Sequence, residues 1–155
     1  MRIELTGVVP ASIEDVFDFL DDAANVIKLG GHAAGHVAGI EVVDSKPDGR
    51  RTVDIRMRAG DREWVQTIEQ VVRERPTRLV TRGGTWQESR DAVILAITTE
   101  RRLSPGPDGT IVTLMVDYEP GRQSRVQAAR VWLQRGATRR ELEHQLDLLA
   151  KHFAS

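Results

Sequence analysis

The sequence contains no cysteine, few aromatic residues and no long apolar run. Without cysteine, the chain forms no disulfide, offers no thiol nucleophile and supplies no thiolate to a metal. No run of about eighteen apolar residues occurs, so we expect no membrane span. The amino terminus lacks a basic region followed by an apolar run, which argues against an export signal. We therefore expect a cytoplasmic protein.

An excess of charge of one sign is also absent. The 155 residues include 22 Lys and Arg against 23 Asp and Glu, which gives a net charge of −1. A chain without a strong field of its own has no general attraction to nucleic acid. We expect no nucleic-acid partner.

Several enzyme motifs are missing as well. The chain has no glycine-rich phosphate loop followed by Lys and Ser or Thr, no dinucleotide fingerprint and no nucleophile-elbow pentapeptide. Nucleophilic catalysis is therefore not expected, and we predict no cofactor. A length of 155 residues with 40% hydrophobic content fits one domain, residues 1–155, with one core. Such a domain is expected to be a monomer or a homodimer.

The hydrophobic pattern changes its period early in the chain. Alternation predicts a first strand that ends at Pro10. Ser12 followed by Asp15 resembles a capping box, and apolar residues at helical spacing over 13–20 predict a short helix. Residues Ala23–Leu29 predict a second short helix, after which glycines indicate a loop.

Strands separated by turn signals fill the middle of the sequence. Turn chemistry such as Pro47-Asp48-Gly49 lies between them. The predicted strands are residues 37–45, 51–59, 62–74, 79–82, 91–103 and 111–118. The pattern predicts an α+β protein with an antiparallel sheet.

A long arginine-rich helix is predicted from about Gly121 to Ala154. One cylinder roughly 10 Å across cannot fill the concavity of a twisted sheet, so we expect a cavity between the helix and the sheet. The stripe from Leu142 to Phe153 is apolar. The earlier stretch from Arg135 to Thr138 is polar, which indicates a partly open lining, because buried polar groups need partners.

Four local motifs follow one another in a characteristic order. They are Val9-Pro10-Ala11-Ser12 with the helix that follows, Arg75-Pro76-Thr77-Arg78-Leu79, Leu103 and Pro105 ahead of Gly109-Thr110, and Asp117-Tyr118-Glu119-Pro120. Together with the element order, they resemble the START-like, pollen-allergen-like and polyketide cyclase/dehydrase proteins, the SRPBCC superfamily, over essentially the whole chain. The resemblance implies a helix-grip fold, in which a curved antiparallel sheet of about seven strands wraps around a long C-terminal helix, with two short helices after strand 1. It also implies a cavity that binds a lipid, a polyketide or an aromatic metabolite.

Polar residues at one end of this expected cavity are the best candidates for ligand binding. They are Thr99, Arg101, Tyr118, Arg135 and Thr138. Arginine suits a carboxylate, enolate or phenolate oxygen through its fork of donors. The alternative for Arg101 and Arg135 is surface pairing with carboxylates such as Glu100 or Glu141.

Two further candidates lie on the predicted strand 62–74. Trp64 shares a strand face with Gln66, and a ring with a polar N–H beside an amide suits a wall that touches an amphipathic ligand. Ordinary core packing is the alternative for Trp64. Trp86 follows a pair of glycines and is expected to pack at the rim.

Two histidines lie four residues apart in the glycine-rich loop. His32 and His36 have no cysteine and no clear third ligand near them, so we predict no metal site. Either imidazole is a candidate general acid or base. Arg101 and Arg135 are the other catalytic candidates, as residues that would stabilise a negatively charged oxygen. Solvated loop positions are the alternative for both histidines.

Three hypotheses about function remain open from the sequence. The first is a domain that binds a small hydrophobic or amphipathic ligand. The second is a polyketide cyclase/aromatase-like enzyme in which polar pocket residues transfer protons. The third is a regulatory module that contacts a protein partner.

Overall fold

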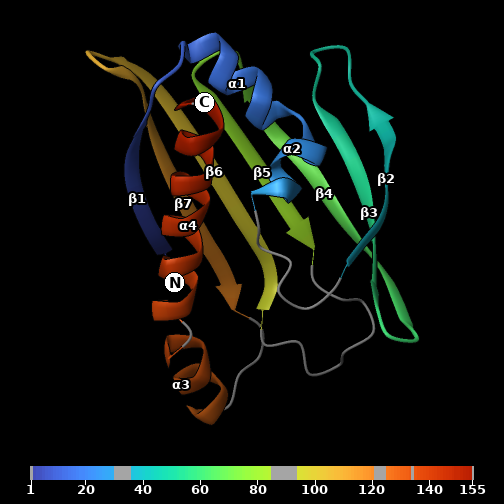
Figure 1. Ribbon diagram of the computed structural model, residues 1–155. Coiled ribbons are helices and arrows are strands. Elements are labelled where there is room, and N and C mark those ends of the chain that lie inside the picture. Colours follow the sequence, from blue (N-terminus) through green and yellow to red (C-terminus); the bar gives the residue numbers. More distant parts are fainter. Residues whose placement is uncertain (1, 30–35, 85–93, 121–124, 134, 155) are drawn as a thin grey trace.

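The computed structural model describes residues 2–29, 36–84, 94–120, 125–133 and 135–154. Within these ranges, an N-terminal strand and two short helices precede a run of strands, and helices end the chain (Figure 1). In chain order the elements are β1 (Arg2–Val9), α1 (Ile13–Asp21), α2 (Ala23–Lys28), β2 (His36–Ser45), β3 (Arg51–Ala59), β4 (Arg62–Glu74), β5 (Arg78–Gly84), β6 (Ile94–Gly106), β7 (Gly109–Pro120), α3 (Arg125–Leu133) and α4 (Arg135–Ala154).

The strands form one antiparallel sheet in the order β1-β7-β6-β5-β4-β3-β2. Each strand from β2 to β7 pairs with the next along the chain, and β1 returns to pair with β7. Figure 1 shows the sheet curving around α4, with α1 and α2 at one end of its open face. The expected α+β helix-grip architecture and the two short helices after β1 are confirmed.

The inner face of the sheet is apolar because the strands alternate with the pleat. On β3 the buried residues are Val53, Ile55 and Met57, and on β7 the alternating positions from Val112 to Val116 are buried. The turn between β6 and β7 requires glycine: Gly109 has a φ of +135°, and a Cβ there would lie 2.2 Å from the carbonyl oxygen of Val9. This close approach sets the β6–β7 turn against the end of β1.

Helix α1 begins where the capping pattern predicts. The Ser12 hydroxyl accepts a hydrogen bond from the Asp15 backbone N–H at 3.2 Å, which satisfies one free donor of the first turn. Its apolar stripe, Val16, Phe17 and Leu20, is buried. The helix is thereby anchored on the core at the end of the sheet where α4 finishes.

The buried apolar residues form two clusters. The larger one joins α1 and α4 to β1, β6 and β7, and includes Phe17, Val112 and Leu149. The smaller one consists of Val53, Ile55 and Met57 on β3, with α2 and β4 residues packed against it. A core split in this way leaves space between its parts.

The C-terminal helical region is described as α3 and α4, and residues 121–124 and 134 lie outside the described residues. Helix α4 buries Leu142 and Leu149 against the sheet, whereas Trp132 and Leu133 of α3 are 67% and 70% exposed. The expected C-terminal helix on the sheet is therefore confirmed for α4, and its packing supplies most of its stability.

No described helix combines the length and the apolar character that crossing a membrane requires. No group of His, Asp and Glu side chains in the described part of the chain is arranged to hold a metal ion.

Candidate functional site

A cavity of about 330 Å³ lies between the sheet, the α1–α2 corner and α4. The apolar residues that line it are Leu20, Ala23, Val26, Ile27, Ile40, Val42, Val53, Ile55, Ile68, Ile97, Val116 and Leu142. The polar and charged residues that line it are Asp21, Asp22, Arg51, Gln70, Thr81, Thr99, Arg101, Tyr118, Thr138, Glu141 and Gln145. Because members of both core clusters line it, the cavity occupies the space between the two clusters.

The cavity reaches solvent between α2 and β2. Ile40 and Val42 of the edge strand β2 line it and are still 39% and 50% exposed. Ala23, Val26 and Ile27 of α2 line the same cavity. An apolar molecule that enters here therefore meets aliphatic side chains first.

Arg101, on β6, is one of the buried residues that line this cavity. Its strand neighbours in register are Leu79 and Leu114, both buried. The side chain is itself buried, with 8% of its surface exposed. Within the described residues it has no hydrogen bond and no ion pair, which is unusual for a buried charge.

Burial lowers the pKa of Arg101 to about 10, because removing the guanidinium from water disfavours its charged form. The side chain nevertheless remains protonated at neutral pH. No described protein group offsets this loss of solvation with a hydrogen bond or an ion pair. The free protein thus holds a cation against its cavity.

The neighbouring residue Glu100 shows that Arg101 is not surface-paired. Glu100 points to the outer face of β6, where it accepts hydrogen bonds from Arg78 at 2.8 Å and from Arg102 at 2.6 Å. Burial opposes the charge on Glu100, but these two hydrogen bonds outweigh it and lower the pKa of Glu100. Alternation along the strand separates the two charges, so the surface-pairing alternative is wrong for Arg101.

Two hydroxyl groups that line the cavity join the sheet to α4. The Tyr118 hydroxyl donates a hydrogen bond to Thr138 Oγ1 at 3.2 Å. Further along α4, the Gln145 amide lies 3.5 Å from Glu141 Oε1. The cavity wall formed by α4 therefore carries a hydroxyl, a carboxylate and an amide.

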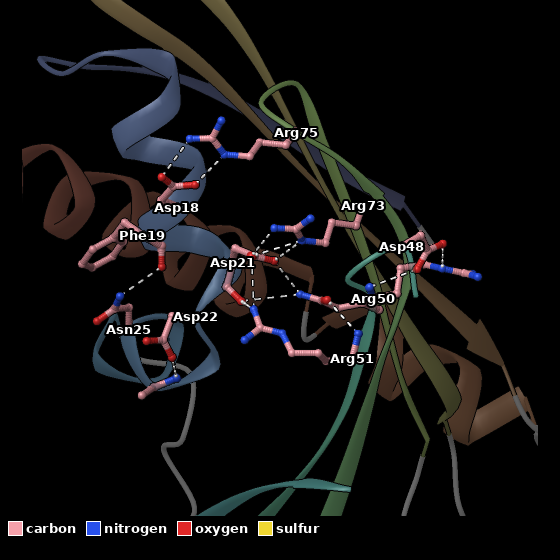
Figure 2. Close-up of polar contacts among 12 residues, drawn as sticks. Asp18, Phe19, Asp21, Asp22, Asn25, Asp48, Arg50, Arg51, Arg73 and Arg75 are labelled. Carbon is pink, nitrogen blue, oxygen red and sulfur yellow. Dashed lines mark hydrogen bonds and ion pairs between the residues drawn. The ribbon is translucent and has the colours of Figure 1, made fainter. Parts of the chain in front are cut away.

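An ion cluster lies where α1 meets the sheet (Figure 2). Asp21, the last residue of α1, accepts hydrogen bonds from Arg73 Nη2 at 3.0 Å and Gln70 Nε2 at 2.9 Å, and Arg51 Nη2 lies 3.1 Å from the same carboxylate. Arg51 also donates to the Asp21 backbone carbonyl at 2.9 Å. We call Asp21, Arg51, Gln70 and Arg73 the Asp21 cluster. It fastens the α1–α2 corner to β3 and β4 at the rim of the cavity.

An exposed pair accompanies the Asp21 cluster. Arg75 donates to Asp18 at 2.9 Å and 3.0 Å, so that two side chains of α1 meet arginines of the β4 end (Figure 2). The hydrogen bond from Arg75 lowers the pKa of Asp18.

The structure places the predicted site residues in three groups. Thr99, Arg101, Tyr118 and Thr138 lie on the cavity wall. His36, the first residue of β2, is exposed and is not part of that wall. His32 and Trp86 lie outside the described residues.

Trp64 and Gln66 do not line the cavity, contrary to expectation. Trp64 pairs with Met57 near the β3–β4 turn and packs on the smaller core cluster. It is six residues from Gln70, or about 20 Å along an extended strand. Trp64 borders a separate hollow of about 220 Å³ with Arg56 and Arg58.

Arg135 is also displaced from its expected place. As the first residue of α4 it is exposed and does not line the cavity, whereas Thr138, nearly one turn later, does. The arginine at the cavity wall is therefore Arg101 of the sheet and not Arg135 of the helix.

The sequence interpretation missed the Asp21 cluster. Alternation on β3 does place Arg51 on the same face as Val53 and Ile55, so a charge on an apolar face was a usable signal. Its partner, Asp21, comes from the end of a helix thirty residues earlier. No local pattern connects these positions.

A family model described as "Polyketide cyclase / dehydrase and lipid transport" matches residues 1–154. The chain belongs to this family. A search of curated proteins found no match.

Solved structures of low sequence identity share the fold. The Zhui aromatase/cyclase from Streptomyces sp. R1128 has a TM-score of 0.70 and 14% identity, over 99% of this chain and 93% of its own. A START superfamily protein from Mycobacterium smegmatis has a TM-score of 0.68 and 17% identity, over 99% and 97%. The di-domain ARO/CYC BexL from the BE-7585A biosynthetic pathway has a TM-score of 0.70 and 17% identity, and this chain, covered completely, spans 50% of it.

Proposed function

We propose that this family member binds a small hydrophobic or amphipathic molecule in the cavity between the sheet and α4. The observation that carries the proposal is the cavity of about 330 Å³, whose walls come from both core clusters. Ligand sites of this size, largely apolar with a few placed polar groups, are typical of small-molecule binding. Filling the cavity would restore the contacts that the split core lacks.

A fluorescent apolar probe tests this proposal. N-phenyl-1-naphthylamine, which is uncharged and emits strongly in apolar surroundings, is expected to bind with 1:1 stoichiometry. Native mass spectrometry of the same sample checks the stoichiometry and reveals any molecule retained from the expression host. No binding of the probe, of aliphatic alcohols or of any retained molecule would refute the proposal.

Two adjacent threonines on β6 offer a matched pair of variants. Thr99 lines the cavity, whereas Thr98 lies in register with Arg82 and Asp117 on the other face of the sheet. Thr99→Trp is expected to fill the cavity and weaken probe binding at least tenfold. Thr98→Trp introduces the same ring outside the cavity and is expected to leave binding within about twofold of wild type.

A second candidate function is a cyclase-like enzyme. It is favoured because Arg101, Tyr118 and Glu141 line the same cavity, in a chain of the polyketide cyclase/dehydrase family. In this candidate, Glu141 removes a proton from the carbon between two carbonyl groups, and the oxygen of the resulting enolate pairs with Arg101.

Deuterium exchange at the central carbon of an aryl 1,3-diketone, followed by NMR, tests this second function. The enzyme would accelerate exchange, and Glu141→Gln would abolish the acceleration while the probe still binds. Binding of the diketone without faster exchange would leave only the binding function.

A further inference from the structure

Arg101 is the one charged side chain on the described cavity wall that is both buried and without a hydrogen-bond or ion-pair partner. We propose that the cavity selects an anionic amphiphile, whose acidic group pairs with Arg101 while its apolar body lies against α2 and β2. This inference rests on the proposed binding function and adds the chemical class of the ligand.

Geometry supports an oxyanion at this position. The aliphatic neighbours Leu79 and Leu114 flank Arg101 in the sheet and offer no acceptor. The guanidinium is a planar fork of donors that matches a carboxylate, sulfonate or enolate better than a neutral carbonyl. In a poorly hydrated site such a pair is much stronger than it is in water.

The other charged groups around the cavity have partners of their own. Asp21 is held by Arg51 and Arg73. Asp22 accepts from the Ala24 backbone N–H at 2.9 Å. Glu141 is approached by the Gln145 amide. Among the charged residues that line the described cavity, Arg101 is therefore the one whose charged group has no hydrogen-bond or ion-pair partner, which favours a ligand that brings an acidic group to this position.

The position of Arg101 also sets the direction of the ligand. Arg101 is 8% exposed, whereas Ile40 and Val42 at the α2–β2 mouth are 39% and 50% exposed. The acidic group therefore lies at the inner end and the apolar tail points toward the mouth. A long tail would extend past these exposed side chains.

A pair of fluorescent probes that differ by one acidic group tests the inference. 1-Anilinonaphthalene-8-sulfonate is N-phenyl-1-naphthylamine with one added sulfonate. Both probes are titrated into wild type, Arg101→Met and Arg102→Met. Arg102 is the matched control because it follows Arg101, faces the other side of the sheet and is exposed.

The sulfonate probe is expected to lose at least about thirtyfold in affinity on Arg101→Met, as for other buried charge pairs that lose one partner. Arg102→Met is expected to change its affinity less than about threefold. The neutral probe is expected to bind wild type and Arg101→Met equally well, or the variant better. Arg101→Lys, which keeps the charge and loses the fork, is expected to give an intermediate affinity.

A second experiment uses only the wild-type protein, so it does not depend on how any variant folds. It compares a carboxylic acid with the alcohol of the same chain length as competitors of the neutral probe. Decanoate is expected to displace the neutral probe at a concentration at least tenfold lower than 1-decanol does. Equal displacement by the acid and the alcohol would overturn the inference and leave the binding function standing. Failure of all probes to bind wild type would overturn both.

Discussion

The arginines on the concave side of the sheet differ in what neutralises their charge. Arg51 and Arg73 surround the carboxylate of Asp21, and the Gln70 amide completes the cluster. Arg101 has a more buried side chain and no carboxylate in the described structure close enough to pair with it. The arginines of the Asp21 cluster have a carboxylate partner within the chain, and their ion pairs stabilise the fold. Arg101 has no such partner, which is explained if a bound ligand supplies it.

The largest expected change in stability comes from breaking the ion pairs of the Asp21 cluster. Asp21→Asn removes the only charge that compensates Arg51 and Arg73 within the cluster. We expect the free energy of unfolding to fall by roughly 3 kcal/mol, since truncating one side of a buried ion pair leaves the other side uncompensated. Urea denaturation measures this change.

Asp18→Asn is the control for Asp21→Asn. It removes a carboxylate from the same helix, but from the exposed pair with Arg75, and is expected to cost far less. Equal losses from the two variants would show that burial does not distinguish them.

The next largest change is a gain in stability. Arg101→Met replaces an uncompensated cation with an apolar side chain of similar length, and we expect the free energy of unfolding to rise by about 2 kcal/mol. Residues kept at a cost to stability are typical of binding sites. Urea denaturation of the ligand-free variant measures the rise, and a clear loss of stability would mean that Arg101 has a structural role.

A smaller effect concerns Glu100, next to Arg101 on the opposite face. Its folded-state pKa is lowered from 4.5, so its stabilising contribution is present above about pH 4.5 and is lost as the pH falls through the folded-state pKa. Glu100→Gln is expected to cost about 1 kcal/mol or less at pH 7. Denaturation at several pH values should show the difference from wild type shrinking below pH 4.5, and a constant difference would contradict this account.

The sequence allowed most of the fold to be predicted, because alternation, helical spacing and turn residues are local signals. The strands from β1 to β7 and the cap of α1 at Ser12 follow from such signals. The apolar stripe from Leu142 to Phe153 is another such signal, and Leu142 and Leu149 are the residues of α4 that are buried.

The candidate site was predictable only in part. Alternation identifies the face on which Thr99 and Arg101 lie, and both line the cavity. It does not fix how far along the sheet a residue stands from α4, which is why Trp64 was misplaced. Whether a buried arginine meets a carboxylate depends on contacts between distant segments, as Asp21 and Arg73 illustrate.

The most direct test of the central claim is the effect of Arg101→Met on the free energy of unfolding, measured without ligand and again with saturating decanoate. A ligand stabilises the folded state by an amount that grows with the logarithm of its concentration divided by its Kd. We predict that the variant is more stable than wild type when free, and that decanoate removes most or all of this difference because it stabilises wild type more. The same sign and size of difference under both conditions would contradict the claim that Arg101 awaits an acidic ligand.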